Sequence, residues 1–181
     1  MTATQPTTQT AVQTAPEIAV TAVEAQVGGF VASQELAEAL QAVLTDMVAL
    51  HLVGKQAHWN IVGPNFRDLH LNLDELVDIA RAGTDEVAER MRALHVTPDG
   101  RPDQVAAATT LPEFPAGEIL TTDAIGHVVK AIEAAVGTMR RVHDTVDEND
   151  PTSTDLLHSY IEKLEQQAWF MAAETWTPKK A

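Results

Sequence analysis

Residues 33–94 read SQELAEALQAVLTDMVALHLVGKQAHWNIVGPNFRDLHLNLDELVDIARAGTDEVAERMRAL. Apolar residues recur at steps of three and four across residues 36–53, and they do so again across residues 66–94. This spacing is typical of amphipathic helices, which turn one apolar face toward a core. The pattern predicts two long helices, one ending near residue 60 and the other near residue 95, that fold back against each other.

Polar side chains that can accept a hydrogen bond from the first turn of a helix mark the expected helix starts. Ser33 precedes the first helix, Asn65 precedes the second, and Thr122 precedes a third. Gly63 and Pro64 separate the first two helices, because neither residue is favourable inside a helix.

The second half of the chain repeats the helical pattern after a longer connection. Residues 103–120 contain DQVAAA and LPEFPAG, which predict a crossover with one or two turns of helix. Helical spacing then returns in residues 122–150 and 151–171, with Pro151 at the break. We expect an all-α four-helix bundle with a short helix in the crossover between its second and third long helices.

The composition excludes several classes of protein. The chain has 181 residues, enough for one domain, and only 4% are aromatic, so the core is expected to consist of Leu, Val, Ile, Ala and Met. The absence of cysteine excludes disulfides and thiolate-ligated metals. The formal net charge of −14 disfavours binding to nucleic acids and anionic membranes. We identify neither a secretory signal nor an apolar run of the roughly 18 residues that a membrane helix requires, so we expect a cytoplasmic protein.

The two ends of the chain differ from its middle in composition. Residues 1–30 are rich in Thr, Ala, Gln and Val and show no sustained period. We therefore expect a flexible N-terminal tail over residues 1–30, the helical bundle over residues 31–176, and a short C-terminal tail over residues 177–181.

Five side chains with metal-binding chemistry lie in the first two helices. Imidazole nitrogens and carboxylate oxygens are suitable ligands for iron and other divalent metals. The candidates are His58, His70, Asp74, Asp85 and Glu89. The last four fall within a wedge of about 100° on one face of the second helix. Asp74 and Asp85 are nevertheless roughly 16 Å apart along the helix axis, which is too far for them to bind one ion.

The spacing of these residues along the second helix is symmetric. His70 and Glu89 lie equally far on either side of the midpoint of residues 79–80, and so do Asp74 and Asp85. An antiparallel copy of the helix, related by a two-fold axis at that midpoint, would place His70 opposite Glu89 and Asp74 opposite Asp85. The spacing therefore predicts a dimer with two shared metal sites.

Two other features bear on this predicted dimer. Ala80, Ala82 and Gly83 lie near its centre and are small enough to let two helices approach closely. His58, at the end of the first helix, would add an imidazole to one side of each site. Taken singly, each carboxylate is more commonly a solvated surface charge, and a His and Asp pair one turn apart is more commonly a surface pair. The symmetric spacing and the second histidine raise the metal site above this background, but the residues alone leave both interpretations open.

The segments KQAHWNIVGPNFRDLHLNLDELVD (residues 55–78) and DEVAERM (residues 85–91) resemble the signature of the Dps family of mini-ferritins. The resemblance includes the HWN motif at residues 58–60 and the twelve-residue step to His70. A weaker similarity continues in LEQQAWF, residues 164–170.

This resemblance implies a ferritin-like bundle whose ferroxidase centre lies between two-fold-related subunits. His58, His70 and Asp74 would come from one chain, and Asp85 and Glu89 from the other. It also implies a hollow dodecamer, built from two-fold dimers, that oxidises Fe(II), preferably with hydrogen peroxide, stores ferric mineral and protects the cell from oxidative stress. Larger ferritins use Glu-x-x-His pairs within one subunit, and no glutamate in this chain has a histidine three positions later.

Further residues have two interpretations each. Trp59, beside His58, is either an electron donor to stray radicals or a packing residue. An acidic group in the turn between the third and fourth long helices either lines a cation pore at a three-fold axis or forms an exposed acidic loop and helix start. Its members are Asp147, Glu148, Asp150 and Asp155. The other histidines belong to no comparable group and are expected to be structural or exposed. They are His51, His95, His127, His143 and His158.

The tails depart from those of DNA-binding family members, which usually carry many Lys or Arg residues because neutralised phosphates supply the affinity. Residues 1–30 contain neither, the first basic residue is Lys55, and only Lys179 and Lys180 close the chain. We therefore expect weak or absent DNA binding. Three classes of function remain: a ferroxidase and iron store, a nucleoid-associated DNA-binding structural protein with little enzymatic activity, and a bundle that binds another metal.

Overall fold

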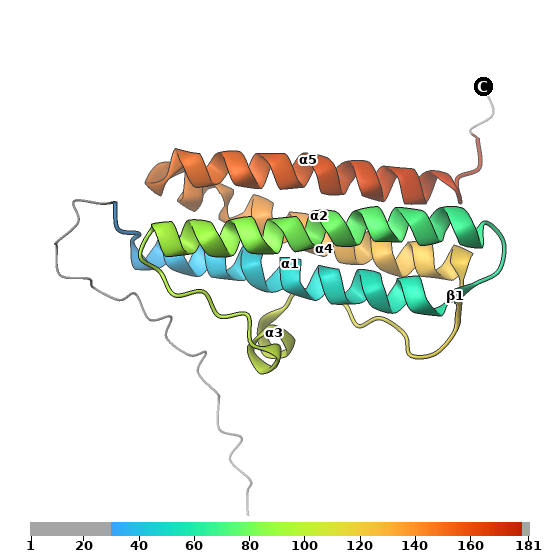
Figure 1. Cartoon of the computed structure of the whole chain (residues 1–181). Helices are drawn as coiled ribbons and strands as arrows, with labels where there is room; N and C mark the ends of the chain where they lie inside the picture. The colour runs from blue at the N-terminus through green and yellow to red at the C-terminus, as the bar shows by residue number, and fades with distance from the viewer. Residues whose placement is uncertain (1–29, 179–181) are drawn as a thin grey trace, which may run out of the picture.

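A computed structural model describes residues 30–178 and contains the expected all-α four-helix bundle (Figure 1). The long helices are α1 (Gln34–Asn60), α2 (Phe66–Ala93), α4 (Thr121–Asn149) and α5 (Pro151–Ala173). A short helix in the crossover was predicted, and it is α3 (Pro102–Ala108). Two strands of two residues each were not predicted: β1 (Ile61–Val62) pairs in parallel with β2 (Ile119–Leu120). The predicted N-terminal tail, apart from Phe30, and residues 179–181 lie outside the described residues, so the boundaries of the tails remain predictions.

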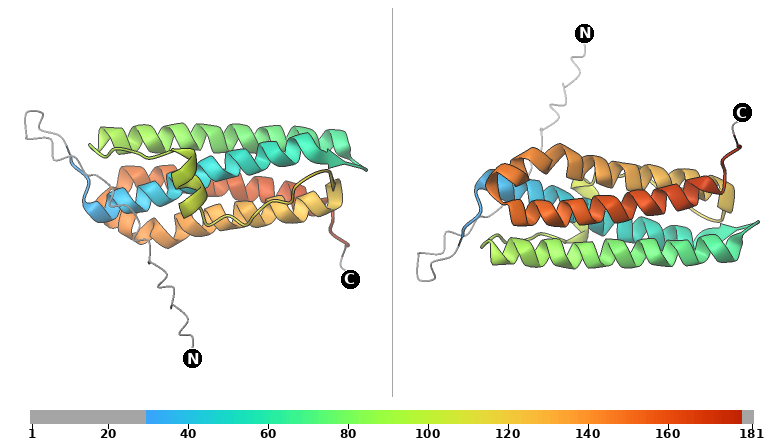
Figure 2. Two further views of the ribbon diagram at one scale, coloured as in Figure 1. Left: turned by 90° about the horizontal axis from the view of Figure 1, so that it is seen from below. Right: turned by 90° about the horizontal axis from the view of Figure 1, so that it is seen from above.

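The order of the helices explains why one connection is long. α1 and α2 are antiparallel neighbours, as are α4 and α5, whereas α2 and α4 run in the same direction (Figure 1). The crossover between α2 and α4 therefore travels the length of the bundle, and α3 lies about midway along it (Figure 2). α1 packs against α2 and α4, and α5 packs against the same two helices.

The turn between α1 and α2 carries the candidate site and depends on local backbone geometry. Ser33 caps the far end of α1 as predicted, because its Oγ accepts a hydrogen bond from the backbone nitrogen of Leu36 at 3.1 Å. Asn65 precedes α2, but its side chain makes no capping hydrogen bond, since its backbone is left-handed with a φ of 55°. Gly63 has a φ of 113°, which would strain any other residue, so glycine allows the turn to close quickly.

The start of α4 is tied to this same turn. The prediction that Thr122 caps α4 was wrong, because the helix begins at Thr121 and has no side-chain cap. Instead, the Thr121 hydroxyl donates a hydrogen bond of 2.7 Å to the backbone oxygen of Pro64. Together with the β1–β2 pairing, this contact holds the end of the bundle that contains the turn.

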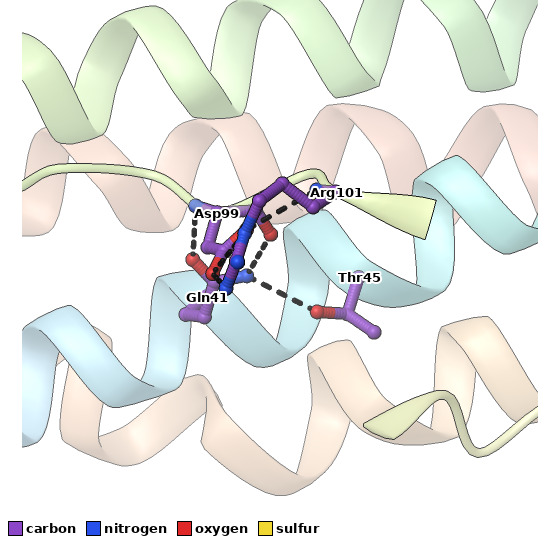
Figure 3. A network of polar contacts seen from close by, with 4 residues as sticks. All are labelled: Gln41, Thr45, Asp99 and Arg101. Carbon is purple, nitrogen blue, oxygen red and sulfur yellow. Dashed lines mark hydrogen bonds and ion pairs between the residues drawn. The ribbon is translucent and has the colours of Figure 1, made fainter. Parts of the chain in front are cut away.

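The crossover is fixed to α1 before it reaches α3 (Figure 3). The Gln41 amide donates to the backbone oxygen of Asp99 and accepts from the backbone nitrogen of Asp99, both at 2.9 Å. The same amide donates to the Thr45 hydroxyl at 3.2 Å. The Arg101 guanidinium in turn contacts the Asp99 carboxylate at 2.8 Å. The Gln41 side chain thus satisfies the backbone N–H and C=O of Asp99, which lies in a segment without a helix or strand of its own.

A buried carboxylate fixes the crossover after α3. Asp46 is only 1% exposed and accepts hydrogen bonds from the Thr109 and Thr138 hydroxyls at 2.8 and 2.6 Å. It also accepts from the backbone nitrogen and the hydroxyl of Thr110, at 2.8 and 2.7 Å. Four donors compensate for the loss of hydration, which makes burial of this charge tolerable.

The core is mainly aliphatic, as predicted, with α1 contributing many of its residues. No unbroken apolar run of about 18 residues occurs in α1, but by length and composition this helix is apolar enough to cross a membrane, since its best 18-residue window has a mean hydropathy of 1.5. In the structure, 61% of that window is buried among the other helices. Packing inside the bundle therefore explains the apolar character of α1.

Two of the three small residues near the middle of α2 lie inside the subunit. Ala80 is 0% exposed and Gly83 is buried, whereas Ala82 is exposed. A Cβ atom on Gly83 would overlap the methyl group of Met47 and lie 2.9 Å from Cε1 of Tyr160. The expectation that Ala80 and Gly83 ease contact with a second copy was therefore wrong, because they ease contact within the bundle.

Candidate metal centre

Three of the five candidate ligands meet where α1 ends and α2 begins. One ligand atom each from His58, His70 and Asp74 lies within 4.8 Å of the other two. Within residues 30–178, this is the one such group of three metal-binding side chains. His58 is 9% exposed, whereas the other two are half-buried. The antiparallel return of α2 along α1 brings together residues that are twelve or more positions apart.

Reciprocal hydrogen bonds orient the two imidazoles. Nδ1 of His58 lies 3.2 Å from the backbone oxygen of His70, and Nδ1 of His70 lies 3.1 Å from the backbone oxygen of His58. Because a carbonyl oxygen only accepts, each Nδ1 carries the proton and donates it. The rings stack with their centroids 3.6 Å apart. This tautomer leaves both Nε2 lone pairs available to a metal ion.

The electrostatics of the site keep His58 neutral. Burial is the largest cause that lowers the pKa of His58, and repulsion from His70 and Lys55 acts in the same direction against the attraction of Asp74. A neutral imidazole is the form that binds a metal, so no proton must be displaced from Nε2 near neutral pH.

Lys55 is a member of this site that sequence reasoning missed. Its Nζ donates to Oδ1 of Asp74 at 2.6 Å, and this hydrogen bond is the main cause that lowers the pKa of Asp74. The carboxylate is therefore ionised near neutral pH but already paired with an ammonium group. The signal was present in the sequence, because Lys55 lies three residues before His58 and so shares its face of α1.

The other two candidate ligands do not join this group. Asp85 and Glu89 are exposed on the outer face of α2, more than two turns beyond Asp74. Asp85 borders an open pocket of about 480 Å³ on that face. The residues around this pocket are Asp78, Arg81, Ala82, Thr84, Asp85 and Ala88. One subunit thus presents three candidate ligands in one place and two in another.

The aromatic neighbours of the histidines differ in exposure. Phe66 stacks on His70 with a centroid separation of 5.2 Å and so supports that ring. Trp59 is 71% exposed, which excludes a packing role inside this subunit. Its role as an electron donor stays a prediction.

The acidic turn between α4 and α5 contains one member that the structure places differently from expectation. Asp147, Glu148 and Asp155 are exposed. Asp150 is only 6% exposed, and its Oδ2 lies 2.7 Å from Nη2 of Arg90. Its carboxylate is committed to an ion pair inside the subunit, so we withdraw Asp150 from the predicted pore lining.

Comparisons with known proteins place this geometry in a wider context. The model of the Ferritin-like domain family matches residues 37–181. The chain is 38% identical over 142 residues to the fine tangled pili major subunit of Haemophilus ducreyi, covering 76% of this chain and 73% of that protein. It is 30% identical over 141 residues to the DNA protection during starvation protein of Mycolicibacterium smegmatis, covering 78% and 77% of the two chains. Among solved structures, Dps from Microbacterium arborescens in the high iron form is 35% identical with a TM-score of 0.74, covering 81% of this chain and 98% of that one.

Proposed function

Because this chain belongs to the Dps family of ferritin-like proteins, a family associated with iron storage and DNA protection, we propose that it is a ferroxidase whose substrate is Fe(II). The observation that carries the proposal is the convergence of His58, His70 and Asp74, one ligand atom of each lying within 4.8 Å of the other two. Two imidazoles and one carboxylate are a donor set that suits Fe(II). The exposed side of the group leaves room for further ligands and for an oxidant.

A second copy of the chain would complete the site. With two α2 helices antiparallel about residues 79–80, the exposed Asp85 and Glu89 of one copy would face Asp74 and His70 of the other. The partner's carboxylates would add negative charge beside Asp74 beyond what the one Lys55 ammonium neutralises, so this register favours binding of a metal cation.

The same register satisfies the charges at the centre of the contact. Asp78 and Arg81 are both exposed and also lie equally far from the midpoint of residues 79–80. An antiparallel copy would therefore set each aspartate against an arginine of the other chain, which favours this alignment over shifted ones.

The chemistry we assign to the site is oxidation of Fe(II) by hydrogen peroxide. Two Fe(II) ions each give one electron, and one peroxide molecule takes both electrons and two protons to become two water molecules. Because the oxidant accepts both electrons at one site, hydroxyl radicals are not released. The Fe(III) product would hydrolyse and collect as mineral inside a hollow dodecamer built from two-fold dimers.

We also propose that protection comes from iron chemistry in the cytoplasm and not from tight DNA binding. The chain has a net charge of −14, and residues 1–30 contain no Lys or Arg. A polyanion would be repelled by such a surface at physiological salt. Tight retention of plasmid DNA in a gel-shift assay at about 150 mM salt would contradict this and favour a nucleoid-associated structural role.

Rapid mixing of Fe(II) with peroxide tests the ferroxidase proposal. The double variant H70A/D74A should lose rapid formation of Fe(III), followed by its absorbance, and should keep the helical circular dichroism spectrum. The control H51A/D123A removes the same residue types from surfaces of α1 and α4 and should retain the rate. Equal rates in all three proteins would overturn the proposal.

A further inference from the structure

His143, in the last third of α4, and His158, in the first half of α5, form a second imidazole pair. The α4–α5 turn lies at the opposite end of the bundle from the α1–α2 turn (Figure 1). The Nε2 atoms of the two histidines lie only 2.9 Å apart, and their ring centroids are 5.1 Å apart. The sequence did not predict this contact, although the two histidines were expected to be structural or exposed and His158 is exposed. They are fifteen residues apart, and only the antiparallel packing of α4 and α5 brings them together.

A carboxylate sets the tautomer of one ring. Nδ1 of His143 lies 2.9 Å from Oδ1 of Asp144, which accepts the Nδ1 proton. Nε2 of His143 then presents a lone pair toward Nε2 of His158. A carboxylate behind an imidazole, with the other nitrogen bare, is the arrangement commonly found around metal-binding histidines.

From this geometry we propose that His143 and His158 chelate one divalent transition-metal ion, with water molecules in its remaining positions. For metal–nitrogen bonds of about 2.05 Å, adjacent ligands in a tetragonal or octahedral site lie about 2.9 Å apart, whereas tetrahedral ligands lie about 3.4 Å apart. The observed spacing matches the former. Imidazole ligands in a tetragonal arrangement favour Cu(II) and Ni(II).

The surroundings suit a cation that enters from solvent. Both rings border an open pocket of about 400 Å³, and the His143 and His158 side chains are 32% and 57% exposed. Oδ1 of Asp155 lies 3.9 Å from Nδ1 of His158 and adds negative charge. Arg140, which lines the same pocket, is paired with Glu165 of α5 and so offers little net repulsion.

This inference does not depend on the proposed ferroxidase function, because the two sites share no residue. Cu(II) added to the full chain is the probe, and equilibrium dialysis with elemental analysis counts the bound ions. The variant H143Q/H158Q should bind one Cu(II) fewer per chain than the unaltered protein. The control H51Q, which removes a histidine from α1, should not lower the count. In the background H70A/D74A, the same double substitution should again remove one ion, which separates this site from the α1–α2 centre.

Two further measurements separate chelation from a mere hydrogen bond between the rings. H158Q alone should weaken the binding of this ion at least tenfold, because one imidazole cannot chelate. D144N keeps both ligands and should weaken it by about 10- to 100-fold, as loss of an orienting carboxylate does. The electron paramagnetic resonance spectrum should lose two-nitrogen coupling from this ion in H143Q/H158Q. An unchanged copper count or unchanged nitrogen coupling in that variant would show a shared-proton hydrogen bond only and would overturn the proposal.

Discussion

Replacing Lys55 by glutamine should strengthen metal binding at the α1–α2 centre. The Lys55 ammonium lies 2.6 Å from Oδ1 of Asp74, one of the two carboxylate oxygens that could bind a metal ion. A metal ion that binds through this oxygen has to displace the ammonium, and one that binds through Oδ2 is still repelled by it. K55Q removes this competitor and leaves His58 and His70 untouched, and Asp74 stays ionised because its pKa returns only toward its ordinary value of 3.8.

The exposure of the pair sets the size of the effect. The Lys55 and Asp74 side chains are 29% and 43% exposed, so solvent screens their attraction. Exposed ion pairs of this kind contribute about 0.2–1 kcal/mol, which corresponds to a gain in metal affinity of about 1.5- to 5-fold when the pair no longer has to be broken. Repulsion between the ammonium and the incoming dication acts in the same direction, so these figures are a lower bound.

Anaerobic titration calorimetry with Fe(II) measures this gain directly. K55R keeps a cation at the site and should leave the affinity unchanged within about twofold. K130Q removes an exposed lysine from α4 and controls for the change in net charge. Weaker Fe(II) binding in K55Q, with normal binding in K55R, would show that the cation positions Asp74 and does not compete with the metal, and would refute the reasoning.

Three further predictions concern stability, each measured by chemical denaturation. R90A should destabilise the fold by about 2–3 kcal/mol, because it leaves the buried Asp150 carboxylate without its ion-pair partner; a loss below about 0.5 kcal/mol would contradict the role of this pair. Burial would raise the pKa of Asp150, but hydrogen bonds from Ser153 and Arg90 lower this pKa overall. The ionised Asp150 carboxylate therefore stabilises the fold above its unfolded pKa of 3.8, and this stabilisation is lost as the pH falls through the folded pKa. D150N should therefore flatten the pH dependence of stability below about pH 4, and an unchanged slope would contradict this. G83A should cost about 1–3 kcal/mol because its Cβ overlaps core side chains, whereas G137A, with open space around its Cβ, should stabilise α4 by up to about 1 kcal/mol; equal effects would be inconsistent with the packing described here.

The helices were predictable because their signals are local. Ser33 caps α1 through a residue three positions away, and the break at Gly63 and Pro64 needs no knowledge of the rest of the chain. Thr121 was missed as the start of α4 because its hydroxyl bonds to Pro64, 57 positions earlier. The β1–β2 pair escaped prediction for the same reason, since two residues carry no period of their own.

In the candidate site, too, local contacts were predictable and long-range contacts were not. His70 and Asp74 lie one turn apart on α2, so their shared face follows from helix geometry alone. To predict that Lys55 contacts Asp74, one must also know that α1 and α2 are in contact at this level. The pairing of His143 with His158 depends on how α4 crosses α5, which periodicity does not specify.

If each iron site is shared between two chains, co-assembly of two inactive variants should restore activity. H70A/D74A lacks one half of every site, and D85N/E89Q lacks the other half. If the two are mixed in equal amounts, unfolded and reassembled, half of the dimers should be mixed, and each of these should contain one intact site of its two. We predict recovery of about a quarter of the unaltered protein's Fe(II) oxidation rate. A rate no higher than that of either variant reassembled alone would contradict a shared site.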